Sequence, residues 1–170
     1  MPWRKPFEQP GQRIAPVIWF VVWAGITGVG VALQPDPHGH GTHQQLGLMP
    51  CPSVLAFNRP CPGCGLTTSW TRLLHGDLAG AFAAHALGPI AYLLFTVSAW
   101  LGLVGVLRGF RLDSDSPHFN RLVTVAATVF FIYGLTRMAL VNDYRSPRER
   151  ILVQTAWQAV QPKPDAAPPK

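Results

Sequence analysis

Charged residues are scarce in this chain of 170 residues. Asp, Glu, Lys and Arg make up 13% of it, about half the ~25% usual in a soluble protein, while 48% of the residues are hydrophobic. The hydrophobic residues are concentrated in three long blocks and are not spread evenly along the chain. This distribution disfavours a soluble globule and favours a membrane protein with a single domain.

Acidic residues are the scarcest charged type. Eight Asp and Glu stand against 14 Lys and Arg, which gives a net charge of +6. Such an excess can indicate nucleic-acid binding. The Lys and Arg residues stand mainly at the ends of the hydrophobic blocks, however, where cations anchor membrane helices at anionic headgroups. We therefore expect the lipid bilayer as a partner and no nucleic acid.

Each hydrophobic block is long enough to cross the membrane as a helix, which takes about 20 residues for about 30 Å of hydrocarbon. We expect transmembrane helices over about 14–33, 78–107 and 122–141, the second of them kinked at Gly88-Pro89. No A-x-A-like site follows the first block, so we expect a retained helix and not a cleaved signal peptide. The predicted fold class is an all-α membrane protein with three transmembrane helices.

The segments around this membrane domain, which we place at residues 14–145, are more polar. Residues 1–13 form a polar N-terminal arm. Ser146-Pro147-Arg148-Glu149 has the pattern of a capping box, so we expect an amphipathic helix over 146–160, on the membrane surface or packed against the other helices. The Pro-rich residues 161–170 are predicted to be disordered.

Only three cysteines occur, and all of them lie in residues 51–77, which we call the cysteine segment. Prolines exclude a regular helix around Cys51 and Cys61, and Gly63 and Gly65 permit a tight turn at Cys64. Two thiols in a C-x-x-C turn are a frequent half-site for zinc. We predict that Cys51 supplies a third sulfur and His75 a fourth ligand, which would make a closed structural zinc site at the membrane surface.

Two other interpretations of the cysteines stay open. Cys61 and Cys64 can form a redox-active pair, with Cys51 as a resolving thiol or mixed-disulfide partner, or all three can be plain structural residues. A short helix over 66–75, capped by Thr67, Thr68 or Ser69, is expected to follow the turn and lie at the interface. Asp77 is then placed to cap the next helix.

Histidines and one arginine offer further candidates. His38, His40 and His43 fall in HGHGTH and could bind a metal, but the Gly-rich loop fixes no geometry, and we prefer solvated side chains. For His85 we prefer a partly buried imidazole over a proton carrier. Arg137 interrupts the third hydrophobic block, which makes it a functional candidate, and we expect it to reach the surface or pair with an acidic residue.

The sequence CPGCGLT followed by LLHGDLAGAF and a long hydrophobic helix resembles the bacterial membrane protein family known as domain of unknown function 2752. The resemblance covers about residues 50–137. The matching positions are Cys51, Cys61, Pro62, Gly63, Cys64, Gly65, Thr67, His75, Gly76 and Asp77, and Arg137 resembles an arginine that members often carry. Many members have Arg where this chain has Thr68. The resemblance implies a bacterial membrane location and supplies no known reaction, and it adds Thr67, Asp77 and Arg137 as candidate functional residues.

Orientation follows weakly from the positive charges, because both sides of the membrane carry several. The first helix usually dominates, which favours a cytoplasmic N-terminus and an extracytoplasmic cysteine segment. An oxidising compartment would permit a disulfide, whereas the reverse orientation favours thiolates and zinc.

The expected function is that of a non-enzymatic accessory protein. A hydrolase is disfavoured, because no set of nucleophile, base and acid stands out. Its cysteine segment would fix a surface for a membrane protein partner or a second copy of the chain. The alternatives are a membrane thiol-disulfide oxidoreductase and a subunit of an oligomeric transporter, since three helices are too few to enclose a pathway.

Overall fold

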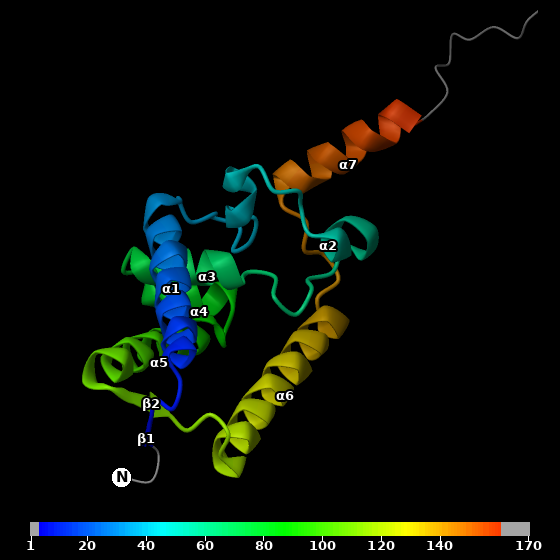
Figure 1. The fold of residues 1–170 in the computed structure, drawn as a ribbon. Coiled ribbons are helices and arrows are strands. Elements are labelled where there is room, and N and C mark those ends of the chain that lie inside the picture. Colours follow the sequence, from blue (N-terminus) through cyan, green and yellow to red (C-terminus); the bar gives the residue numbers. More distant parts are fainter. Residues whose placement is uncertain (1–3, 161–170) are drawn as a thin grey trace, which may run out of the picture.

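The structure, a computed structural model, describes residues 4–160 and consists almost entirely of helices (Figure 1). Within the described residues three helices are long and apolar enough to cross a membrane, namely α1 (Ile14–Ala32), α5 (Gly88–Arg108) and α6 (Pro117–Leu140). The shorter helices are α2 (Pro52–Phe57), α3 (Leu66–Leu74), α4 (Leu78–Ala84) and α7 (Pro147–Val160), and 3-10 turns cover Pro10–Arg13 and Thr42–Leu46. The predicted all-α membrane fold is confirmed.

Helices α1 and α5 pack against each other along most of their length. Three hydrogen bonds between side chains cross this interface: Trp19 to Ser98 (3.0 Å), Trp23 to Thr96 (3.0 Å) and Thr27 to Tyr92 (2.8 Å). Because lipid offers no competing water, such bonds stabilise helix pairs inside a membrane.

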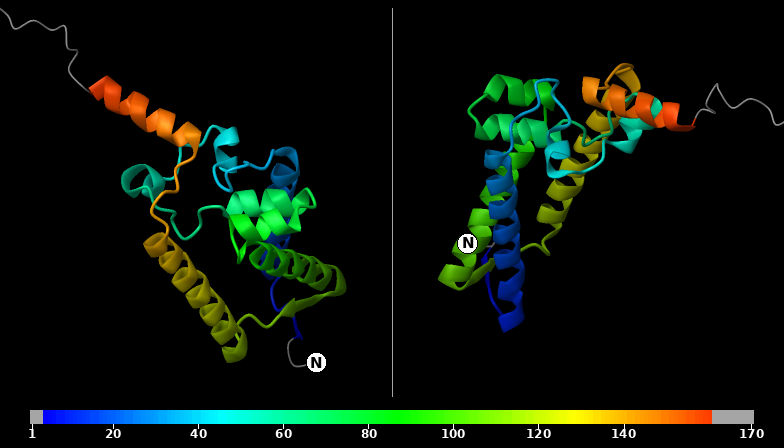
Figure 2. Two further views of the ribbon diagram at one scale, coloured as in Figure 1. Left: turned by 180° about the vertical axis from the view of Figure 1, so that it is seen from behind. Right: turned by 90° about the horizontal axis from the view of Figure 1, so that it is seen from above.

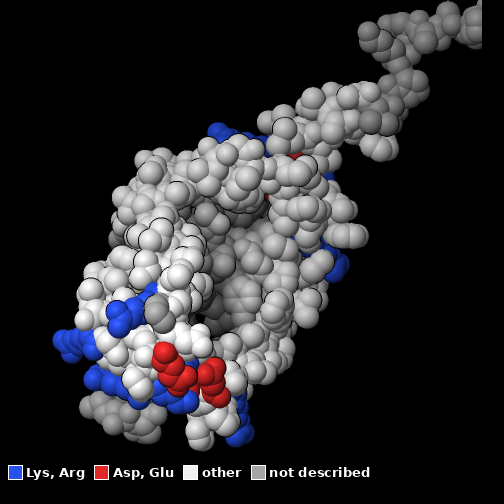
Figure 3. Space-filling model, viewed as in Figure 1, with Lys and Arg blue, Asp and Glu red and all other residues white. Residues whose placement is uncertain are grey.

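Helix α6 stands apart from the α1–α5 pair (Figure 1), and the surface is hollowed between them (Figure 3). It meets the rest of the described chain mainly through loops. Gly134 lies against Pro62, and the Tyr133 hydroxyl accepts a hydrogen bond from the backbone N–H of Ala86 (3.2 Å). The position of α6 therefore depends on the cysteine segment.

The two ends of the molecule carry different secondary-structure elements. At one end the N-terminal arm forms β1 (Arg4–Pro6), which pairs antiparallel with β2 (Phe110–Leu112). An ion pair between Lys5 and Asp113 (2.9 Å) holds the arm there, and Lys and Arg gather at this end (Figure 3). At the other end α3, α4 and α7 lie across the direction of the long helices (Figure 2, right). The strand pairing was not predicted, because it joins segments about 100 residues apart.

The predicted helix over 78–107 is two helices. Helix α4 ends at Ala84, and α5 begins at Gly88 after a turn in which the Gly88 N–H donates to the carbonyl of His85 (2.8 Å). Pro89 cannot donate to a continuing helix, and a side chain at position 88 would collide with Ser69. The Gly-Pro pair thus starts a helix here and does not merely kink one.

The third long helix begins at Pro117, five residues before the predicted start at 122. The Ser116 hydroxyl accepts from the N–H of Phe119 (3.2 Å), and Pro117 occupies the first turn, where its missing N–H costs nothing.

Helix caps account for most of the other boundaries. Helix α3 is preceded by Gly65 in the left-handed conformation (φ +86°), so the predicted caps Thr67, Thr68 and Ser69 lie inside the helix. Asp77 caps α4 as predicted, accepting from the N–H of Gly80 (2.8 Å).

The predicted capping box of α7 is confirmed. Ser146 N–H donates to the Glu149 carboxylate (2.9 Å), and Glu149 N–H donates to the Ser146 hydroxyl (3.2 Å). The predicted disordered tail, residues 161–170, lies outside the described residues.

Candidate metal centre

The sulfur atoms of Cys51, Cys61 and Cys64 converge on one point. All three lie within 4.8 Å of one another, and Cys61 Sγ and Cys64 Sγ are 3.0 Å apart. We call these residues the cysteine cluster. Its members come from two places: Cys51 directly precedes α2, whereas Cys61 and Cys64 form the turn before α3.

The C-x-x-C turn is fixed by its own backbone. Cys64 N–H donates to the carbonyl of Cys61 (3.0 Å), and Cys61 N–H donates to Cys64 Sγ (3.1 Å). Gly65 follows with positive φ, and a side chain there would collide with the backbone of Ala84. The turn that brings the two sulfurs together is thus held against the α4–α5 junction.

Two thiols of the cluster differ in acidity. Burial would raise the pKa of Cys51, but hydrogen bonds from the Cys64 thiol, from the N–H of Val54 and from the Cys61 thiol outweigh it and lower that pKa. Burial raises the pKa of Cys64 well above its usual value, and the neighbouring sulfurs add to the effect. Of these two residues, Cys51 is therefore the one that forms a thiolate more readily.

This donor set fits a thiophilic metal ion. Tetrahedral zinc with sulfur at about 2.3 Å needs sulfurs about 3.8 Å apart, so Cys61 and Cys64 would separate by less than an ångström. Because zinc binds cysteine as thiolate, binding would release the thiol protons that remain in the cluster.

The expected fourth ligand does not join the cluster. His75 is exposed at the end of α3, and its Nδ1 lies 2.8 Å from the carbonyl of Thr71 in the same helix. Within the described residues the only group of three or more metal-ligating side chains that converge is the cysteine cluster itself, so the HGHGTH histidines form no such site. A bound metal would keep its fourth position open to water or another ligand.

Arg137 fastens α6 to the cysteine segment. Its guanidinium donates to the carbonyls of Cys64 (2.7 Å) and Ala84 (2.9 Å) and to the hydroxyl of Tyr144 (2.9 Å). No acidic residue in the described chain pairs with it, so the expected salt bridge is absent there. The guanidinium instead donates to backbone oxygens beside the cluster.

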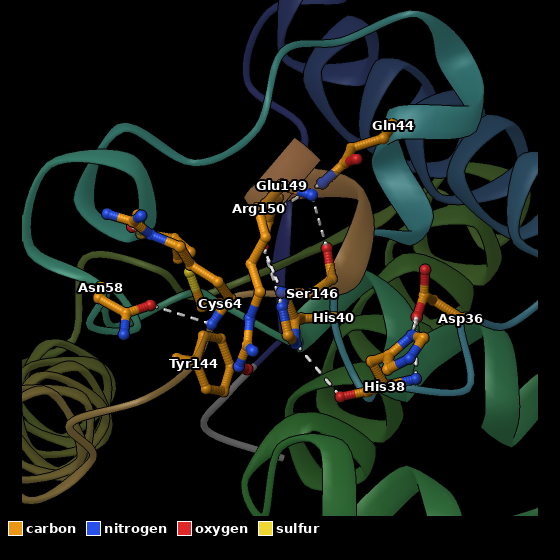
Figure 4. A network of polar contacts seen from close by, with 12 residues as sticks. Asp36, His38, His40, Gln44, Asn58, Cys64, Tyr144, Ser146, Glu149 and Arg150 are labelled. Atoms are coloured by element: carbon orange, nitrogen blue, oxygen red, sulfur yellow. Dashed lines mark hydrogen bonds and ion pairs between the residues drawn. The ribbon is translucent and has the colours of Figure 1, made fainter. Parts of the chain in front are cut away.

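The hydrogen bond from Arg137 to Tyr144 leads into a polar network that reaches α7. Figure 4 shows the part of it around Tyr144, His40 and Glu149. The Tyr144 ring stacks on His40 with centroids 4.2 Å apart, and burial raises the pKa of Tyr144 to about 12. His40 Nε2 lies 3.1 Å from the carboxylate of Glu149, which is 1% exposed and also accepts from Gln44 (3.0 Å). The HGHGTH loop is therefore a structural partner of α7, which no local sequence signal indicated.

Burial alone would raise the pKa of Glu149. The hydrogen bonds from His40 and from the Ser146 N–H outweigh burial and lower that pKa below its usual value. The carboxylate is therefore ionised at neutral pH and holds the first turn of α7.

His85 lies fully buried at the break between α4 and α5. Its Nε2 donates to the carbonyl of Pro62 (3.1 Å), and its ring stacks on Phe130 at 5.5 Å between centroids. Burial lowers the pKa of His85, and the nearby charge of Arg137 lowers it further. The preferred interpretation, a neutral buried imidazole, agrees with this geometry: His85 supports the C-x-x-C turn from behind.

The remaining predicted residues lie away from the cluster. Asp77 serves as a helix cap and sits 3.5 Å from Arg72. Thr67 lines an apolar groove beside α1.

The comparison with known families concerns the part of the chain just described. Residues 51–99 match the family model described as "Protein of unknown function (DUF2752)". The match begins at Cys51, includes the whole cysteine cluster and α2 to α4, and ends within α5, which confirms the resemblance seen in the sequence. No curated protein and no solved structure matches the chain.

Proposed function

We propose that this integral membrane protein is a non-enzymatic accessory protein whose cysteine cluster binds zinc and thereby fixes a partner-binding surface at one end of its transmembrane helices. The observation that carries this proposal is the convergence of three sulfurs from two separate segments within 4.8 Å. A metal held there would link the start of α2 to the turn before α3. That link would stabilise the arrangement of the helices around the cluster.

Three features support a structural role for such a metal. The cluster is connected through Arg137 to α6, through the Gly65 turn to the α4–α5 junction, and through Tyr144 and His40 to α7. Helices α3, α4 and α7 would then be locked as one layer across the ends of the long helices. Such a layer, with α7 projecting from it (Figure 1), suits contact with another membrane protein.

We further propose a bacterial cell membrane location with a cytoplasmic N-terminus. Lys and Arg gather around β1 and β2, where the N-terminal arm meets the α5–α6 connection. A positive end of this kind usually stays in the cytoplasm. The cysteine cluster would then face outward, where a bound metal would also protect the thiolates from oxidation. A reporter enzyme fused after α7 and active only outside the cytoplasm tests this orientation.

A second candidate, a thiol-disulfide oxidoreductase, is favoured by one observation: the lowered pKa of Cys51 beside two thiols. The Cys51 thiolate would attack a partner's disulfide and release one partner thiolate. Cys61 or Cys64 would then displace the second, so that two cysteines of this chain are oxidised and the partner's disulfide is reduced.

One experiment distinguishes the two functions. Detergent-purified protein is analysed for bound metal and free thiols, beside Cys64→Ser and the control Ser53→Ala, which leaves all three thiols in place. The zinc proposal predicts about one zinc per chain in the wild type and in S53A and none in C64S. A metal-free wild type, together with a mixed disulfide trapped through Cys51 in a variant that carries both C61S and C64S, would refute it and favour the oxidoreductase.

The accessory role has its own test. Cross-linking in native membranes should join the wild type to a partner, and C64S should lose this product while still inserting into the membrane. Cross-links that persist unchanged in metal-free C64S would contradict a metal-fixed binding surface.

A further inference from the structure

An apolar groove of about 410 Å³ lies between the C-terminal third of α1 and helix α3. Gly25, Ile26, Val29 and Gly30 line it from α1, and Trp70 lines it from α3. Ile26 and Val29 are 38% and 42% exposed. Because α1 is long and apolar enough to cross the membrane, this side of the groove opens toward the hydrocarbon of the bilayer.

Beyond the end of α1 the groove is lined by leucines and by two side chains that can form hydrogen bonds. The side chains of His43, from the loop after α1, and Thr67, from α3, line it there. Within the described part of the chain neither side chain makes a hydrogen bond. The groove therefore changes from hydrocarbon-like walls to two hydrogen-bonding groups as it approaches the membrane surface.

The volume of the groove, about 410 Å³, falls in the range of small-molecule sites, about 300–1,000 Å³. A single hydrocarbon chain is thin enough to lie along such a groove.

We propose that this groove binds one glycerophospholipid of the surrounding membrane. An acyl chain lies beside Gly25 and Val29, and the Thr67 hydroxyl and a His43 N–H donate to the ester or phosphodiester oxygens. The amphipathic lining matches the two halves of such a lipid in the order in which a bilayer presents them. The site also gives Thr67, in the segment that matches the family model, a role apart from the cysteine cluster.

The glycines of α1 provide a matched test. Nothing lies within 4 Å of a Cβ added at Gly25 or at Gly28, but only Gly25 lines the groove. Gly25→Leu therefore adds a side chain toward the groove from a Cβ that meets no atom, and Gly28→Leu makes the same change on the same helix outside the groove. Val29→Trp fills the groove from the next turn and serves as the second variant if G25L folds poorly.

The purified proteins are delipidated, incubated with a mixture of phosphatidylethanolamine and phosphatidylglycerol, and examined by native mass spectrometry. We expect one phospholipid per chain on the wild type and on G28L, and about tenfold lower occupancy on G25L and V29W. Thr67→Val should lower the occupancy as well.

Three results would overturn the proposal: a wild type without bound lipid, equal occupancy on G25L and the wild type, or an equal loss on G28L, which would indicate a non-specific lipid layer. A wild-type dimer that G25L dissociates would also overturn it, because the occupant would then be a second copy of the chain.

Discussion

Arg137 is the residue whose substitution most sharply probes how the membrane helices are joined to the cysteine segment. It holds three oxygens that belong to three different parts of the chain: the C-x-x-C turn, the end of α4 and the loop before α7. We consider Arg137→Lys. Lysine keeps the positive charge, at a similar cost of insertion into the membrane, but its single ammonium group cannot reach all three oxygens as the guanidinium fork does.

The magnitude follows from the bonds that are lost. Each hydrogen bond to a charged group contributes about 1.5–3 kcal/mol. If lysine keeps two of the three, the turn at Cys64 opens about tenfold to a hundredfold more often, since about 1.4 kcal/mol corresponds to a factor of ten. Cys64 is 8% exposed, so its reaction with a thiol reagent requires such an opening.

The assay is the rate at which a maleimide modifies Cys64 in reduced, metal-free protein, measured on the Cys64 peptide by mass spectrometry. Arg121→Lys is the control, because Arg121 is an exposed arginine of the same helix without a hydrogen bond to the described chain. Modification should be about tenfold to a hundredfold faster in R137K than in R121K. If Cys64 reacts equally fast in both variants, Arg137 does not hold the turn and the reasoning fails.

Three further predictions follow from the site. His75→Ala should retain the full metal content measured by elemental analysis, because His75 lies outside the cluster; loss of the metal would make it a ligand after all. Glu149→Gln should speed hydrogen exchange in the first turns of α7, and acidification should act likewise. Because the folded pKa of Glu149 is lowered, its stabilisation of α7 is complete above the usual carboxyl pKa of about 4.3 and is lost as the pH falls through the lower folded value. If neither the substitution nor acidification changes the exchange rate, the Glu149 carboxylate does not hold the first turn of α7. Tyr144→Phe should raise the Cys64 modification rate less than R137K does, since it leaves the guanidinium with its bonds to the carbonyls of Cys64 and Ala84 and keeps the ring stacked on His40.

The features that the sequence predicted correctly depend on neighbours along the chain. Three helices that can span a membrane follow from length and hydrophobicity, and the cap of α7 follows from Ser146 and Glu149 three residues apart. The approach of Cys61 and Cys64 follows from the glycines and prolines around them. Each of these depends on a local pattern whose physical consequence is nearly independent of the rest of the fold.

The features that were missed depend on contacts between distant segments. His40 contacts Glu149, which lies 109 residues further along the chain. Arg137 donates to two backbone carbonyls, and because every residue has a carbonyl, no residue type in the sequence indicates which ones it contacts. The choice of His75 as a fourth ligand assumed that α3 would turn its C-terminal end toward the cluster, whereas the turn at Gly65 packs the start of α3 beside it. The break between α4 and α5 likewise depends on a distant contact, because Ser69 of α3 leaves no room for a side chain at position 88.

The most direct test of the account is X-ray absorption at the zinc edge on protein purified from its native membrane. A zinc ion in the cysteine cluster predicts three sulfur neighbours at about 2.3 Å and one lighter nitrogen or oxygen neighbour, with the sulfur signal lost in Cys64→Ser. Protein without zinc, or a sulfur shell unchanged in C64S, would contradict the claim that Cys51, Cys61 and Cys64 form a metal centre.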